Sequence, residues 1–176
     1  MRFVWLIGLF VGFGIGACDS IQVDLNERAQ TLSVQREIAH YESQIGQLKH
    51  AQAAWMAAME GLNRSVDTVS VARAMRKEVL PRLRTYAALT RLISPSSVAL
   101  RQIHIILVEA VSEVQGESHR FADGLSEANY PQRRVVLQGA LQVFHRRQQA
   151  YRERLGVHYA NYGRVLSGGS EVPLDD

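Results

Sequence analysis

The residues best suited to chemistry in this chain are histidines and carboxylates set within apolar helical patterns. Glu37 and His40 have the Glu-x-x-His spacing of di-iron sites in helical bundles, because residues three apart share one helical face. Such a site needs the motif twice together with further carboxylates, and the sequence holds no second copy. We therefore expect no metal site and no cofactor. The weak metal-ligand candidates are Glu37, His40, His104 and His158.

A second set of polar residues falls in phase with the apolar residues of four predicted helices. If neighbouring helices run antiparallel from their connecting turns, Arg76 meets Glu117, and Gln52 meets Gln148 at a similar height. Trp55 then lies level with Arg76. A buried polar layer that fixes helix register would explain this set. The alternative is a small pocket in which Arg76 receives an anionic ligand.

The same pairing brings His158 beside Tyr41, with the other candidate histidines within about one helical turn. Hydrogen-bonded or solvated histidines are the simpler interpretation of this cluster. The sequence contains no nucleophile elbow, phosphate-binding loop or pair of carboxylates in a predicted cleft. We therefore expect no enzymatic activity.

These residues are positioned by four long helices, which the apolar periodicity predicts. Apolar side chains recur at alternating steps of three and four, the spacing of a helix face that packs against neighbours. The patterns run over residues 34–62, 69–93, 100–121 and 137–165. Pro81 must kink or split the second helix, since it lacks an N–H group. Short connections between long helices predict an all-α fold, an antiparallel up-down-up-down four-helix bundle.

Composition and charge agree with a folded helical domain. The chain has 47% hydrophobic and 21% charged residues, which excludes a disordered or collagen-like protein. Its net charge of +3 is too small to indicate nucleic-acid binding. Successive segments alternate in sign, with residues 19–63 and 95–130 acidic and residues 64–94 and 131–166 basic. In the expected bundle each helix neighbours two of opposite sign, so the basic segments need no external ligand.

The N-terminus has the anatomy of an export signal. A positive start, Met1-Arg2, precedes an apolar run that ends in small residues before Cys18, the sole cysteine. The apolar stretch 3–17 would be about 22 Å long as a helix, and a membrane-spanning helix needs about 30 Å. Ile15-Gly16-Ala17-Cys18 resembles the lipobox of bacterial membrane lipoproteins, which covers only residues 1–18.

That resemblance implies cleavage before Cys18, lipid on its thiol, and an anchored protein that faces the periplasm from the cell envelope. Asp19 resembles an inner-membrane retention signal. The expected organisation is a signal peptide at 1–17, a lipidated cysteine and tether at 18–33, the bundle at 34–166 and a disordered tail at 167–176. We expect a non-catalytic bundle that binds another envelope protein. The alternative is a ligand- or metal-binding sensor that uses the polar layer.

Overall fold

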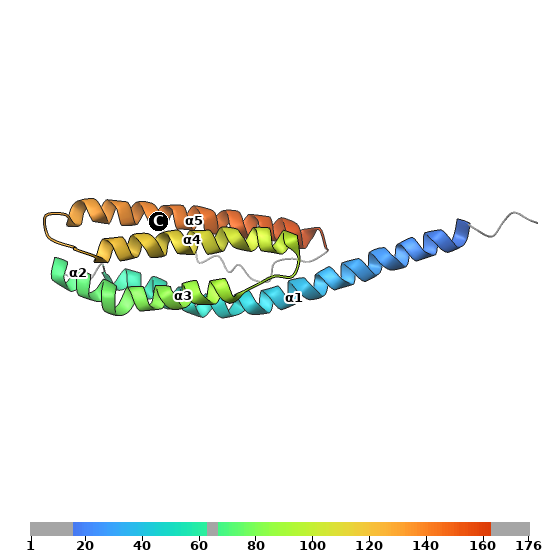
Figure 1. Ribbon diagram of the computed structural model, residues 1–176, viewed down its shortest axis with the longest axis horizontal. Coiled ribbons are helices and arrows are strands. Elements are labelled where there is room, and N and C mark those ends of the chain that lie inside the picture. Colours follow the sequence, from blue (N-terminus) through green and yellow to red (C-terminus); the bar gives the residue numbers. More distant parts are fainter. Residues whose placement is uncertain (1–15, 63–66, 163–176) are drawn as a thin grey trace, which may run out of the picture.

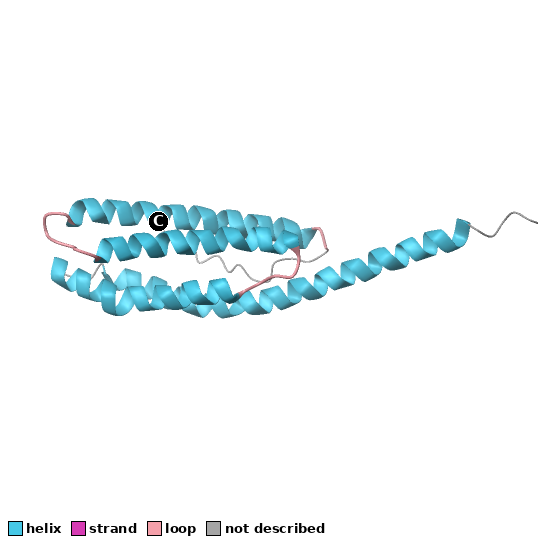
Figure 2. Cartoon of the chain, viewed as in Figure 1, coloured by secondary structure: helices cyan, strands magenta, loops and turns pink. Residues whose placement is uncertain are grey.

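The computed structural model describes residues 16–62 and 67–162, and every regular element in these ranges is a helix. Helix α1 covers Gly16–Leu62. A continuous helical run follows, made of α2 (Thr68–Ala74), the π-helical turn η1 (Met75–Val79) and α3 (Leu80–Leu92). The last two helices are α4 (Val98–Ala122) and α5 (Tyr130–Ala160). The predicted all-α class is confirmed. Figure 2 shows the loops that join α3 to α4 and α4 to α5.

The N-terminal part of α1 forms an arm that projects beyond the other helices (Figure 1). Residues 19–33 are therefore helical, whereas an extended tether of 15 residues could reach about 50 Å. As a helix, the 16 steps from Cys18 to Val34 span about 24 Å. Residues 1–15 of the expected signal peptide and the expected tail at 167–176 lie outside the described residues. None of the described helices is both long and apolar enough to cross a membrane.

Helix starts follow local capping rules. The side chain of Asp67 accepts a hydrogen bond from the Ser70 backbone N–H at 2.7 Å and so caps α2. Ser97 caps α4 by accepting from the Leu100 N–H at 3.3 Å. Pro131 lies in the first turn of α5, where its missing N–H has no cost. These starts agree with the breaks that the sequence predicts.

Pro81 is accommodated by a π-turn and not by a break. Just before it, the Leu80 N–H bonds to the Met75 carbonyl, five residues back, and the helical run continues to Leu92. A π-turn holds about one extra residue, so it rotates the preceding segment relative to a regular α-helix. Met75 is consequently fully buried and Arg76 is exposed. Val69, expected in the core, is 67% exposed, and Val71 takes the buried position.

Aromatic side chains fill the core between helices. Trp55 of α1 stacks on Tyr86 of α3 with ring centroids 5.9 Å apart. It also meets Phe144 of α5 edge-on at 5.2 Å. Leu100 and Val114 of α4 are fully buried in the same core. The four helical segments therefore share one core, which the polar residues described next must enter.

Candidate functional site

A chain of hydrogen-bonded side chains crosses the core and takes one residue from each of four helices. Tyr41 comes from α1, Thr90 from α3, His104 from α4 and Tyr151 from α5. All four are at most 4% exposed. We call this set the Tyr–His chain. It contains His104, the only buried histidine in the described part of the protein.

The contacts give the Tyr–His chain a direction. His104 Nε2 lies 2.8 Å from the Thr90 carbonyl oxygen, which can only accept, so this nitrogen carries the proton. In the neutral ring His104 Nδ1 is then an acceptor, and the Tyr41 hydroxyl 2.8 Å away donates to it. The Tyr41 oxygen in turn accepts from the Tyr151 hydroxyl at 3.0 Å. Protons thus point from Tyr151 through Tyr41 to His104.

The Thr90 carbonyl is available because α3 ends two residues later. The last four carbonyls of an α-helix lack intrahelical partners, and Thr90 is among them. His104, reaching across from α4, satisfies this carbonyl inside the core. The Thr90 hydroxyl donates to the Tyr86 carbonyl at 2.8 Å. The end of α3 is therefore held by a side chain of the next helix.

Burial keeps the Tyr–His chain neutral. Removal from water raises the pKa of Tyr41 and of Tyr151 far above the usual tyrosine range. Desolvation lowers the pKa of His104, and the hydrogen bond to Thr90 opposes this effect. An uncharged imidazole next to the uncharged phenols of Tyr41 and, beyond it, Tyr151 is thus the stable state near neutral pH. This neutral state agrees with the contacts of His104, in which Nε2 donates and Nδ1 accepts.

Of the predicted polar layer, the glutamine pair is present. Gln148 Nε2 donates to Gln52 Oε1 at 3.0 Å, partly buried between α5 and α1. Trp55 lies one turn from Gln52 and is fully buried, as its in-phase position predicts. Its indole N–H has no hydrogen-bond partner among the described residues. The register between α1 and α5 that the sequence predicts therefore agrees with this contact.

The predicted pairing of Arg76 with Glu117 is wrong. Arg76 donates to the Ala122 carbonyl at the end of α4, at 2.9 Å. Glu117 instead pairs with Arg120 on its own helix at 2.6 Å, and its side chain is 21% exposed. The π-turn explains the error, because it puts Met75 where a regular helix would put Arg76. The proposed anion pocket at Arg76 is lost with the pair.

The predicted histidine cluster is also divided. The Glu37 carboxylate accepts a hydrogen bond from the backbone N–H of Ser97. His40 is exposed, and its Nε2 lies 3.2 Å from Nε2 of Gln44. His104 belongs to the Tyr–His chain. Burial lowers the pKa of His158, and the carboxylate of Glu37 opposes that shift. In the described part of the chain no three His, Cys, Asp or Glu side chains lie close enough to hold a metal ion.

The sequence predicts His158 beside Tyr41, but the Tyr41 hydroxyl hydrogen-bonds to His104 and Tyr151 instead. The motifs in the sequence do not single out Tyr151. Its position in the apolar phase of α5 was nevertheless informative, because a buried tyrosine needs a partner for its hydroxyl. Two tyrosines and a histidine in the apolar phases of three helices were therefore the available signal.

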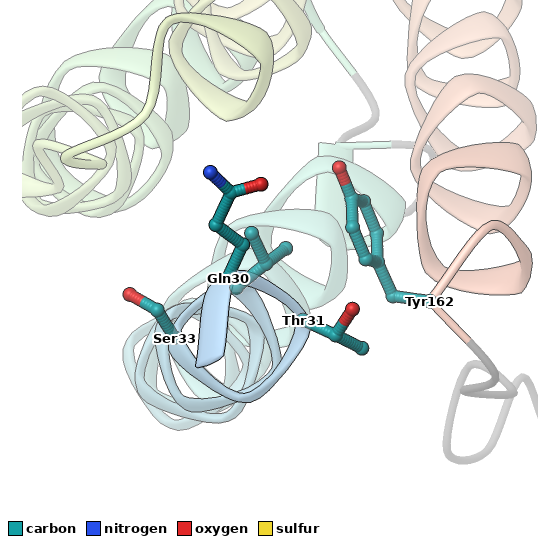
Figure 3. Close-up of a pocket in the computed structure, with 5 residues that line it drawn as sticks. Gln30, Thr31, Ser33 and Tyr162 are labelled. Carbon is teal, nitrogen blue, oxygen red and sulfur yellow. The ribbon is translucent and has the colours of Figure 1, made fainter. Parts of the chain in front are cut away.

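Two pockets open at opposite ends of the helical array, and neither reaches the Tyr–His chain. One of about 460 Å³ lies where the α1 arm leaves the bundle, and Figure 3 shows Gln30 and Tyr162 on its two sides. The other, of about 510 Å³, lies near the α4–α5 connection, at the end away from the arm (Figure 1). We call the second the distal groove. It is lined by Glu117, Arg120, Phe121, Asp123, Arg133, Val136 and Leu137.

Comparison with known proteins finds no family model, no curated protein and no solved structure that matches this chain. A proposal for its function therefore rests on its own residues.

Proposed function

We propose that this protein is a non-catalytic bacterial envelope lipoprotein, an up-down-up-down four-helix bundle anchored through lipid on Cys18, which docks another envelope protein. The lipobox-like sequence Ile15-Gly16-Ala17-Cys18 is the basis for the anchor. Two or more acyl chains, at about 0.8 kcal/mol for each buried methylene, would make membrane attachment effectively permanent. The protein would face the periplasm, and Asp19 favours the inner membrane.

One observation carries the proposal beyond the sequence: α1 runs without a break from Gly16 into the bundle. Cleavage before Cys18 would make the lipidated cysteine the first residue of this helix. Asp19 would then lie in the first turn, where a negative charge is favourable with the helix dipole. The arm would hold the bundle about 24 Å from the acylated residue, as a stiff spacer.

The proposed absence of catalysis is supported by the buried position of the Tyr–His chain. His104 is 4% exposed and Tyr41 1%, and neither lines the pocket at the arm or the distal groove. A substrate needs access to the reacting groups within hydrogen-bond reach. Within the described residues, neither pocket gives a substrate access to the Tyr–His chain. Its evident role is to join helices.

The distal groove is the surface we propose for the partner. Its lining combines three apolar side chains, those of Phe121, Val136 and Leu137, with two arginines and two carboxylates. Val136 is 57% exposed, and its neighbour in sequence Val135 is 67% exposed. Protein interfaces commonly combine apolar contacts with polar and charged groups. The groove also lies at the end that a membrane-anchored arm would hold farthest from the lipid (Figure 1).

The anchor is tested by Cys18→Ser in a bacterial host that is fed a labelled fatty acid. We expect the wild type to take up label and to be shortened by 17 residues, because the thiol is the acylated atom and cleavage follows acylation. Cys18→Ser should remain unlabelled and unprocessed, while the control Ser20→Ala behaves like the wild type. Normal maturation of Cys18→Ser would refute the lipoprotein proposal.

Docking is tested separately with a photoreactive residue at Val136 or, as the control, at Val157. Val157 is 64% exposed and lines neither pocket. Irradiation of intact membranes should give a discrete protein adduct from position 136 and none from position 157. An adduct from 157 alone would contradict the distal groove. Absence of adducts from both positions would contradict docking on either surface.

A further inference from the structure

We propose that the Tyr–His chain is an acid-sensitive tie: protonation of His104 reverses its hydrogen bonds and weakens the association of the four helices. The inference is independent of the lipid anchor and of the partner. It rests on three contacts among buried residues and on the number of donors and acceptors that each group can offer.

In the neutral state every contact of the Tyr–His chain has one donor and one acceptor. Tyr151 donates to Tyr41, Tyr41 donates to His104 Nδ1, and His104 Nε2–H donates to the Thr90 carbonyl. The imidazole uses both nitrogens, and only the neutral ring can offer one of each kind. The arrangement is therefore complementary to a single protonation state.

A second proton on the imidazole would turn Nδ1 from an acceptor into a donor. The Tyr41 oxygen would then accept from the ring, and its own proton would have to turn toward the Tyr151 oxygen. The Tyr151 hydroxyl would in turn need a new acceptor, and its contact in the described structure is with Tyr41. Protonation would thus leave the buried Tyr151 hydroxyl without an acceptor, and an unpaired buried donor destabilises the folded state.

Among the described residues, burial and the hydrogen bond to Thr90 are what shift the pKa of His104, and no negative charge contributes. The ring meets Tyr41 edge-on, with ring centroids 5.6 Å apart, and donates to the backbone carbonyl of Thr90, and neither partner is charged. Arg101, one turn earlier on α4, is exposed and positive. The other groups with resolved electrostatic effects on these tyrosines are Tyr86 of α3 and Arg152 and Tyr159 of α5. None of these three groups carries a negative charge near neutral pH.

The sign of the pH effect follows from linkage. In the unfolded chain His104 has an ordinary pKa of about 6.5. Folding lowers that pKa, because burial penalises the imidazolium. The unfolded state therefore binds the proton more readily, and stability falls as the pH drops below about 6.5 until the folded value is reached. Between pH 7.5 and 5.5 this one residue can reduce the folding equilibrium constant by up to about tenfold.

The test compares urea unfolding of the mature chain, residues 18–176 with Cys18→Ser, at pH 7.5 and 5.5. His104→Gln keeps a donor and an acceptor without titrating in this range, so its folding constant should fall by several-fold less than that of the wild type. His50→Gln, at an exposed histidine of α1 outside the Tyr–His chain, is the matched control and should keep the pH dependence of the wild type. Equal pH dependence of wild type and His104→Gln would overturn the proposal.

A second measurement decides the matter if His104→Gln fails to fold. Ring ¹⁵N shifts of the wild type at pH 7.5 should show His104 protonated at Nε2 and unprotonated at Nδ1. On acidification this ring should stay neutral until the protein unfolds. Protonation of His104 in the folded state near pH 6.5, or a proton on Nδ1 at pH 7.5, would contradict the acid-sensitive tie.

Discussion

The order of donors in the Tyr–His chain predicts that two tyrosine-to-phenylalanine changes differ in cost. Tyr41 lies in the middle, so Tyr41→Phe leaves two buried groups unpaired, His104 Nδ1 and the Tyr151 hydroxyl. At about 1–3 kcal/mol for each, the loss should be roughly 2–6 kcal/mol. Tyr151 lies at the end, and Tyr151→Phe leaves Tyr41 still donating to His104. Its cost should be that of one hydrogen bond, about 0.5–1.5 kcal/mol.

The double variant makes the prediction sharper. With both hydroxyls removed, only His104 Nδ1 lacks a partner, so adding Tyr151→Phe to Tyr41→Phe should restore about 1 kcal/mol or more instead of costing more. Urea unfolding at pH 7.5 can be followed by fluorescence of Trp55, the one tryptophan after Cys18. Tyr130→Phe, half-buried against Phe121, serves as the control and should stay within about 0.5 kcal/mol of the wild type. Equal costs for the two single variants, with an additive double variant, would refute the assigned direction.

Three further changes test the packing of the helices. Gln52→Leu should cost about 1–3 kcal/mol in urea unfolding, because it leaves the Gln148 amide without its partner. Gln148→Leu added to it should recover much of that loss. Purely additive effects of the two changes would contradict the contact. Pro81→Ala should leave stability within about 1 kcal/mol of the wild type or raise it, because the helical run is already continuous there. A large drop in the thermal midpoint would show that the π-turn depends on the proline. Arg76→Ala and Glu117→Ala should show coupling below about 0.5 kcal/mol in a double-mutant cycle, because Arg76 binds the Ala122 carbonyl and Glu117 pairs with Arg120. Stronger coupling would indicate that Arg76 and Glu117 do form a pair.

Local rules account well for the helices and poorly for their polar contacts. Ser97 and Pro131 mark helix starts through capping and a missing N–H, which depend on residues close in sequence. The pairing of Gln52 with Gln148 was also predictable, because α1 and α5 keep a regular phase from end to end. The pairing of Arg76 was not, because a single π-turn rotates that part of its helix. Pro81 was the visible clue, read as a kink or a break.

The sequence by itself determined the helical class and the likeness of residues 15–18 to a lipobox, and it located most helix ends approximately, but not the start of α1, which lies at Gly16 and not near residue 34. These depend on periodicity, capping and short motifs, which are properties of neighbouring residues. Only the tertiary structure decided which polar side chains meet in the core. Tyr41 approaches His104 and Tyr151 across 63 and 110 residues of chain. A rotation of one residue, about 100° around a helix, is enough to replace such a partner, and no local rule specifies the rotation that close packing selects.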